Sequence, residues 1–255
     1  MIRIVHLSDI HMTKNGEPIW GVDVKRSFDL AIDKISEMKQ DIDAIIVSGD
    51  ISDNGSIESY QYVDSAFRKI GVPTYCCPGN HDNIEVLRYV CERGFIKIPQ
   101  SVNIKGWKFI FLNSVVPDNE ELGKNKARGY LDAVSLKELE ENIIKTAENI
   151  VIVLHHPPIE PGGWLNRKLL DNREEFNAII RKYKQVKLVM YGHTHYNLQL
   201  KLEGILYSSP SSIGFAFDKK LPKFEIAKGQ EGYNVLCLSS KAMLCSNILL
   251  VNPMV

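Results

Sequence analysis

Through residue 195 the chain alternates between short, almost continuous apolar runs and longer segments whose apolar residues recur at helical spacing. Continuous apolar runs are typical of strands buried on both faces, and the alternation is typical of βα units in a largely parallel sheet. The runs predicted as strands are residues 2–7, 44–48, 74–77, 108–113, 150–154 and 186–191.

The segments between these runs predict amphipathic helices. Residues 24–38, for example, place Phe28, Ala31 and Ile35 on one stripe. Two later helices are predicted from capping signals, Ser135-x-x-Glu138 and Asn172-x-x-Glu175. The helices predicted from periodicity span residues 24–38, 57–70 and 84–91.

Beyond residue 195 the helical spacing disappears, and the pattern indicates strands of hairpin or meander type. The chain has no internal repeat and no linker rich in Pro, Gly and Ser, so residues 1–255 are expected to form a single domain with two packed sheets. In this domain residues 1–195 carry the βα units, and residues 196–255 complete the second sheet. The late strands are predicted at residues 198–202, 205–207, 233–238 and 242–250.

Composition and charge narrow the class of protein. With 44% hydrophobic and 24% charged residues among 255, the chain is too apolar for intrinsic disorder and can bury a core without a structural metal. Its 31 basic residues balance 31 acidic ones, so no general positive field favours a nucleic-acid partner. The five cysteines form no C-x-x-C pair, and no apolar run approaches the ~20 residues of a membrane span. With no secretory leader pattern, the protein is expected to be cytoplasmic, without a membrane partner.

Metal-competent side chains follow five of the predicted strands. In an open parallel sheet the carboxyl ends of the strands lie along one edge and form the crevice where ligands bind, so these side chains are expected to meet. The motifs are Asp9-x-His11, Gly49-Asp50, Gly79-Asn80-His81-Asp82, His155-His156-Pro157 and Gly192-His193-Thr194-His195.

Each motif alone also has a plain structural interpretation. Asp-x-His or Gly-Asp after a strand is commonly a turn, and His193 and His195 could occupy opposite faces of an extended segment. Coincidence at five strand ends is a poor explanation of the whole set.

Counting the donors indicates what the cluster is for. Seven nitrogen and oxygen donors are too many for one tetrahedral zinc and fit two metal ions that share a carboxylate, with Mn, Fe, Zn or Co as candidates. Two such ions clamp the oxygens of a phosphoryl group and lower the pKa of bound water to about 7. A small phosphorylated substrate is therefore expected. The donors are Asp9, His11, Asp50, Asn80, His155, His193 and His195.

With these motifs in this order, the chain resembles the calcineurin-like metallophosphoesterases over nearly its whole length. The resemblance implies an α/β fold, a four-layer αββα sandwich of two mixed β-sheets flanked by helices. It implies that His81 is a proton donor or transition-state stabiliser oriented by Asp82, and it leaves His156 a supporting or packing role. It further implies that Asp9, His11 and His195 hold one metal, that Asn80, His155 and His193 hold the other, and that Asp50 bridges them.

Smaller features are similar to the branch that contains class III cyclic nucleotide phosphodiesterases and glycerophosphodiesterases, among them residues 49–55 and Glu231-Gly232-Tyr233. Protein phosphatases of the family carry an arginine where this chain has Asn54, which argues against a phosphoprotein phosphatase. Asn113 stands where many members of the branch have Asp, and the sequence gives no reason for the change.

These features predict a dinuclear-metal-dependent phosphoric ester hydrolase, in the first place a phosphodiesterase in which a metal-bound hydroxide attacks phosphorus. A phosphomonoesterase or nucleotide pyrophosphatase on the same site is the alternative, and a catalytically silent binding scaffold is the alternative of another class. The presence of all seven donors and His81 speaks against a scaffold. The physiological substrate, the metals loaded and the oligomeric state, monomer or homodimer, stay open.

Overall fold

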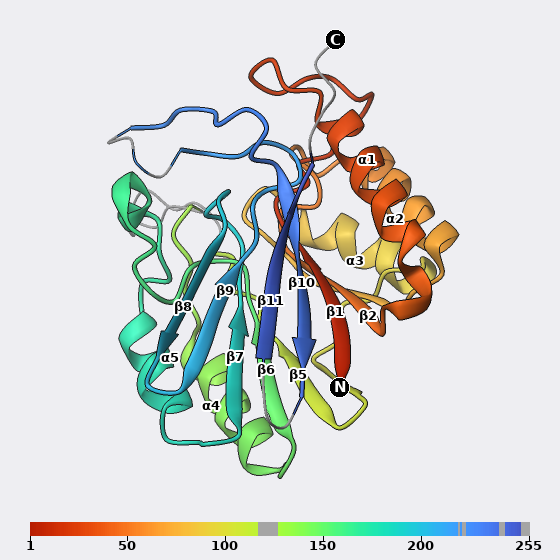
Figure 1. Ribbon diagram of the computed structural model, residues 1–255. Coiled ribbons are helices and arrows are strands. Elements are labelled where there is room, and N and C mark those ends of the chain that lie inside the picture. Colours follow the sequence, from red (N-terminus) through yellow and green to blue (C-terminus); the bar gives the residue numbers. More distant parts are fainter. Residues whose placement is uncertain (117–126, 219, 221–222, 240–242, 251–255) are drawn as a thin grey trace.

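The computed structural model describes residues 1–116, 127–218, 220, 223–239 and 243–250. These contain five α-helices and eleven strands (Figure 1). The helices are α1 (Val24–Glu37), α2 (Ile57–Ile70), α3 (Ile84–Arg93), α4 (Ala133–Ile144) and α5 (Arg173–Ile180). The strands are β1 (Ile2–Leu7), β2 (Ala44–Ser48), β3 (Thr74–Cys77), β4 (Ser101–Ile104), β5 (Trp107–Phe111), β6 (Asn149–Val153), β7 (Val186–Met190), β8 (Leu198–Leu202), β9 (Ile205–Ser209), β10 (Gly232–Leu238) and β11 (Met243–Leu249).

The strands form two mixed sheets. The first sheet has the order β11-β10-β1-β2-β3, and the second has the order β4-β5-β6-β7-β9-β8. Strands β1, β2 and β3 are parallel, as are β5, β6, β7 and β9, while β4, β8, β10 and β11 pair antiparallel with their neighbours. The six runs predicted as one largely parallel set are therefore divided equally between two sheets.

Four layers follow from the alternation of side chains along the strands. In β1, Ile2 and Ile4 belong to the core between the two sheets, while Val5 and Leu7 belong to the core that the first sheet shares with α1, α2 and α3. Helices α4 and α5 pack in the same way on the outer face of the second sheet. Figure 1 shows the two helical groups on opposite sides of the sheets, which confirms the predicted αββα sandwich.

The expectation for the C-terminal part is wrong in one respect. Strands β8 and β9 extend the second sheet as predicted, but β10 pairs antiparallel with β1 and carries β11 with it, so both complete the first sheet. An apolar run indicates a strand but does not encode which distant edge it will pair with. The half-exposed edge strand β4 was missed because its residues form no continuous apolar run.

The predicted helix starts are close but their caps differ. Helix α4 is capped by Asp132, whose carboxylate accepts a hydrogen bond from the Ser135 backbone N–H (2.7 Å), so the helix begins earlier than a cap at Ser135 would place it. Asn172 precedes α5 as expected, but its side chain does not cap the helix. Its amide oxygen accepts a hydrogen bond from the Leu131 N–H, and its amide nitrogen donates one to the Leu131 carbonyl oxygen. Within the described chain no helix is both long and apolar enough to cross a bilayer.

Candidate metal centre

The carboxyl ends of β1, β2, β3, β6 and β7 meet at one end of the sandwich. In Figure 1, β1 runs upward from the N label and β7 points the same way, so their carboxyl ends lie at the same end of the sandwich. All seven predicted donor residues are buried there, with at most 6% of their surface exposed. Chain segments from both sheets thus contribute to one site.

The first group of donors comes from β1 and β7. The Nε2 atom of His195 lies 3.2 Å from an Asp9 carboxylate oxygen and 3.3 Å from Nε2 of His11. Ligand atoms of these three residues lie close enough together to hold one metal ion.

The second group comes from β3, β6 and β7. The Nε2 atom of His155 lies 3.0 Å from the amide oxygen of Asn80 and 3.2 Å from Nδ1 of His193. Asp50 lies between the two groups, with Oδ2 at 3.3 Å from His155 Nε2 and 3.6 Å from His11 Nε2. This is the position that a carboxylate shared by two ions must take.

Hydrogen bonds on the far side of three imidazoles fix their orientation. The Nδ1–H of His155 donates to the Ser48 carbonyl oxygen (2.8 Å), that of His195 donates to the Phe215 carbonyl oxygen (2.8 Å), and that of His11 donates to the Asp53 carboxylate (2.9 Å). Because each Nδ1–H is held in this way, Nε2 is the ring nitrogen that each imidazole directs into the site.

The donor groups are in surroundings that suit a bound cation. Two fully buried carboxylates face imidazole nitrogens that converge on the same place, and the buried Nε2 of His193 has no hydrogen-bond partner. Buried charges and unpaired polar atoms are costly unless a counter-charge or ligand satisfies them. Mixed imidazole, carboxylate and amide donors suit Mn, Fe, Zn or Co, so the residues present fit bound metal.

The pKa shifts in the site favour metal binding. Burial alone would raise the pKa of Asp9 and Asp50, but the facing imidazoles, His195 for Asp9 and His155 for Asp50, hold both below the ordinary value. Burial, with His156 and His155 alongside, lowers the pKa of His193 well below its ordinary value. Ionised carboxylates and neutral imidazoles are the protonation states that coordinate a metal.

His155 differs from the other imidazoles. Burial opposes its protonation, but the charges of Asp50 and Asp9 raise its pKa to about 9. A cation between these groups would compete with that proton, since metal binding releases protons from its ligands.

The backbone is strained where the donors lie. Eight non-glycine residues in the described chain have positive φ, and five of them are proposed ligands: Asp9 (54°), His11 (51°), Asp50 (51°), His193 (68°) and His195 (55°). An L residue in this left-handed region is disfavoured by roughly 1–2 kcal/mol. Strain concentrated in this way is a feature of functional sites, where the surrounding structure holds residues in place.

Glycines allow the strand ends to approach so closely. A Cβ at Gly49, which has φ of 92°, would lie 2.5 Å from Nδ1 of His155, and a Cβ at Gly79 would overlap the backbone and carboxylate of Asp50. The glycines of the Gly-Asp and Gly-Asn motifs are therefore required by packing around the donors as well as by the turns.

His81 lies at the open side of the centre. Its backbone N–H donates to Oδ1 of Asp50 (2.8 Å), its Nδ1–H donates to the Asp53 carbonyl oxygen (3.2 Å), and its side chain is 34% exposed. Burial lowers its pKa, but the hydrogen bond to Asp53 and the charge of Asp50 outweigh this and raise it to about 9.

The residue that orients His81 differs from the one expected. The Asp82 carboxylate accepts hydrogen bonds from the backbone of Gly79 (2.9 Å) and Ser52 (3.0 Å) and from the Tyr60 hydroxyl (3.1 Å), so it ties two turns together. Asp53 instead contacts both His81 and His11. Sequence reasoning missed Asp53, although its position three residues after Asp50 on the same turn was an available signal.

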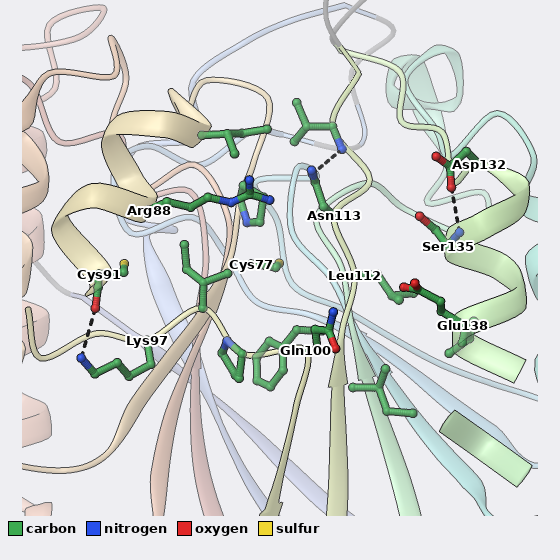
Figure 2. Close-up of a pocket in the computed structure, with 18 of the residues that line it drawn as sticks. Cys77, Arg88, Cys91, Lys97, Gln100, Leu112, Asn113, Asp132, Ser135 and Glu138 are labelled. Carbon is green, nitrogen blue, oxygen red and sulfur yellow. Dashed lines mark hydrogen bonds between the residues drawn. The ribbon is translucent and has the colours of Figure 1, made fainter. Parts of the chain in front are cut away.

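The structure places His156 and Asn113, whose roles the sequence left open, in different surroundings. The ring of His156 is buried beside His155 and His193, and its Nδ1 lies 2.8 Å from the Ser114 hydroxyl. A cavity of about 920 Å³ is lined by Asn113 and by Pro78, which precedes the Gly79 turn. Figure 2 shows Asn113 on its wall, between side chains of α3 and α4. The Asn113 side-chain oxygen accepts a hydrogen bond from the Val115 N–H (3.0 Å) and so shapes the cavity wall.

Comparison with known proteins identifies the family. The model of the calcineurin-like phosphoesterases matches residues 2–197. The chain belongs to this family and is a hydrolase of phosphoric esters. A 3′,5′-cyclic-nucleotide phosphodiesterase of a Nostoc species is 31% identical over 239 residues, which cover 89% of this chain and 87% of that protein. The 3′,5′-cyclic adenosine monophosphate phosphodiesterase CpdA of Pseudomonas aeruginosa is 26% identical over 258 residues, which cover 100% and 92%.

Solved structures confirm the fold. A dimetal phosphatase from Danio rerio superposes with a TM-score of 0.70 over 96% of this chain and 95% of its own, at 12% identity. GAP50, the anchor in the inner membrane complex of Plasmodium, superposes with a TM-score of 0.67 over 97% and 84%, also at 12% identity. Since a phosphatase and an anchor share the architecture, only the side chains of the site can distinguish catalysis from scaffolding.

Proposed function

We propose that this phosphoesterase is a 3′,5′-cyclic nucleotide phosphodiesterase with a dinuclear metal centre. The observation that carries the proposal is the convergence of seven buried donors, with three imidazoles locked so that Nε2 faces inward. The activity named for the Nostoc and Pseudomonas relatives supports the cyclic nucleotide as substrate class.

The donors divide into two ligand sets around a shared carboxylate. Asp9, His11 and His195 would hold one ion, Asn80, His155 and His193 the other, and Asp50 both. Bound ions at this place supply Lewis acidity toward the phosphoryl oxygens and acidify water at neutral pH. The donor set suits Mn, Fe, Zn and Co alike, so which of these metals is bound also depends on which are available to the protein.

His81 is the proposed catalytic residue among the groups that do not bind metal. Because its Nδ1–H is held by Asp53, its Nε2 is directed away from that contact, and the side chain is partly exposed. A protonated Nε2 there can transfer its proton to the ester oxygen that leaves phosphorus, a role that contributes typically 10²–10⁴-fold. Asp53 and Asp82 are positioning residues: the first orients His81, and the second holds the turns that carry Asp50 and Asn80.

A substrate panel on metal-reconstituted protein tests the proposal. It comprises 3′,5′-cyclic AMP, bis(p-nitrophenyl) phosphate, p-nitrophenyl phosphate and a dinucleotide pyrophosphate. We expect kcat/KM to be highest for the cyclic nucleotide and to vanish with a chelator. Preference for the monoester or the pyrophosphate would assign the alternative reaction to the same site, and inactivity on the whole panel at full metal loading would favour the scaffold.

We also propose that residues 1–255 act as one domain in the cytoplasm. The core between the sheets draws residues from β1 as well as from β6 and β7, so the two sheets share one of their cores. All five cysteines are free thiols, as is usual for proteins of a reducing compartment.

A further inference from the structure

Beside the metal centre lies a group of five aromatic side chains, here called the aromatic rim: Trp20, Trp164, Phe215, Phe217 and Phe224. Two of them are largely open to solvent, with 60% of Trp20 and 40% of Phe224 exposed. Phe215 and Phe217 are buried beneath them, at 2% and 7%. An exposed cluster of large apolar side chains on a protein surface commonly marks a binding site.

The buried members of the rim connect it to the proposed ligands. The Phe215 ring centroid lies 4.7 Å from that of His11 and 4.6 Å from that of His195, and Phe217 stacks on His195 at 4.3 Å. Trp20 packs against Phe215 at 4.8 Å and against Phe224 at 4.6 Å. A single buried ring thus separates the exposed indole from two ligand imidazoles.

Trp20 is held in an unfavourable backbone conformation. Ile19 and Val22 exchange both backbone hydrogen bonds (3.0 and 2.9 Å) across a two-residue turn in which Trp20 and Gly21 have φ of 48° and 78°. Positive φ at both central residues is the signature of a type I′ turn, whose first central position favours Asn, Asp or Gly. A bulky residue there is strained, so local turn chemistry does not explain the tryptophan.

Two other hairpins of the chain provide a direct comparison. Lys105-Gly106 and Glu203-Gly204 connect β4 to β5 and β8 to β9 with the same signs of φ. In these turns the strained residue is charged and forms a surface ion pair, Lys105 with Asp43 and Glu203 with Arg181. Only the turn beside the metal centre presents an aromatic ring to water among these three.

We propose that Trp20 and Phe224 stack against the base of a nucleotide whose phosphate lies at the metal centre. Aromatic side chains bind the flat face of any base, so the rim would select phosphodiesters that carry a planar ring system over glycerol or alkyl esters, without reading base identity. This inference rests on the proposed cyclic nucleotide activity and names the residues that give it specificity.

Paired ligands on the metal-loaded protein isolate the stacking contribution. Adenosine 5′-monophosphate and ribose 5-phosphate share the sugar and phosphate, and only the first carries a base. In Trp20→Asn, which suits the turn but removes the ring, we expect the Kd for AMP by calorimetry to rise roughly 5- to 100-fold and that for ribose 5-phosphate to stay within about twofold. Phe224→Ala should give a smaller change of the same kind.

Two controls separate recognition from folding. Glu203→Asn makes the same substitution in a matched turn away from the rim and should leave both Kd values unchanged. The thermal midpoint of Trp20→Asn should not fall below that of the wild type, because the turn accepts Asn. In addition, AMP but not ribose 5-phosphate should quench the tryptophan fluorescence of the wild type, and the quenching should shrink in Trp20→Asn.

The outcomes distinguish this inference from the proposed function. Equal weakening of both ligands would show that Trp20 shapes the metal centre and does not stack, and an unchanged Kd for AMP would likewise overturn the stacking. Wild-type protein that does not hydrolyse any cyclic nucleotide would refute the proposed function. Rapid hydrolysis of cyclic AMP with an unaltered KM in Trp20→Asn would refute the stacking alone.

Discussion

The charged side chains at the two ends of the parallel strands differ in burial and in their partners. At the amino-terminal end, Arg3 pairs with Asp41 (3.5 Å) and Lys105 with Asp43 (2.6 Å), and most of these side chains are open to solvent. At the carboxyl end, Asp9 and Asp50 are buried to within 1% and face imidazoles. Charges that water and each other already satisfy serve stability, whereas charges left buried against lone pairs are arranged for a cation.

The backbone shows the same difference. At the amino-terminal end the hairpin turn places one non-glycine residue, Lys105, in the left-handed region, while the carboxyl end has five ligand residues there. Roughly 1–2 kcal/mol of strain at each must be offset by packing elsewhere in the sandwich. The conformation of the carboxyl end therefore lowers the stability of the fold. Substitutions there should change metal binding and turnover, whereas substitutions at the amino-terminal end should change stability.

The largest effect is expected for Asp50→Asn. One carboxylate faces both ligand groups, so its loss should empty both metal positions and reduce turnover by about a thousandfold or more. Elemental analysis and a cyclic nucleotide assay on the same sample would measure this. Asp43→Asn at the other end is the control and should keep its metal. Two equivalents of metal retained by Asp50→Asn would contradict the shared position.

His81→Ala should leave metal content intact and lower kcat by roughly 10²–10⁴-fold, because it removes a proton donor without removing a ligand. Turnover should recover in part on a substrate whose leaving group is a good one, such as p-nitrophenolate, since that group needs no proton. Unchanged kcat on cyclic AMP would remove His81 from the mechanism.

Asp53→Ala should have an intermediate effect. The Asp53 carboxylate accepts a hydrogen bond from the Nδ1–H of His11, with 2.9 Å between Nδ1 and Oδ1. Without it the ligand imidazole loses its fixed orientation. Partners of this kind contribute roughly 10- to 100-fold to metal affinity or activity. Metal titration followed by turnover at saturating metal would separate the two contributions. Wild-type affinity and turnover together would show that the contact is dispensable.

The smallest effect is expected for Asp43→Asn. Its carboxylate accepts a hydrogen bond from the Arg3 backbone (2.8 Å) and, against the opposing effect of burial, Lys105 and Arg3 lower its pKa from 3.8. A depressed carboxyl pKa adds stability above the unfolded value that disappears as the pH falls through the folded value. The variant should lose ~1 kcal/mol or less by urea unfolding at pH 7, with the curves converging below pH 3.8. A difference that persists in acid would point to packing.

The sequence was sufficient to predict that these side chains meet, because a general rule of topology brings strand ends together. Strands β1, β2 and β3 have the bounds that their apolar runs predicted, and each is followed by a predicted donor. The division into two sheets did not follow from those runs, since β10 reaches β1 from more than 200 residues along the chain and pairing of that kind leaves no local pattern.

Other features depended on contacts that a pattern of polar residues does not reveal. Asp53 looked like an ordinary turn residue until the fold brought His11 and His81 to it. Nothing in the sequence pattern indicated a role for Trp20. Its proposed role depends on the positive φ of its turn and on the imidazoles that pack against Phe215. In both cases the sequence contained the residue type, but its neighbour came from a distant segment.

The donors reach the centre from both halves of the sandwich: Asp9, His11, Asp50 and Asn80 follow strands of the first sheet, and His155, His193 and His195 follow strands of the second. Bound ions would therefore link one half of the sandwich to the other. A chain caught midway through assembly, with only one half formed, cannot gather either complete ligand set. Hydrolysis of phosphoesters would thus require both halves of the sandwich to be in place.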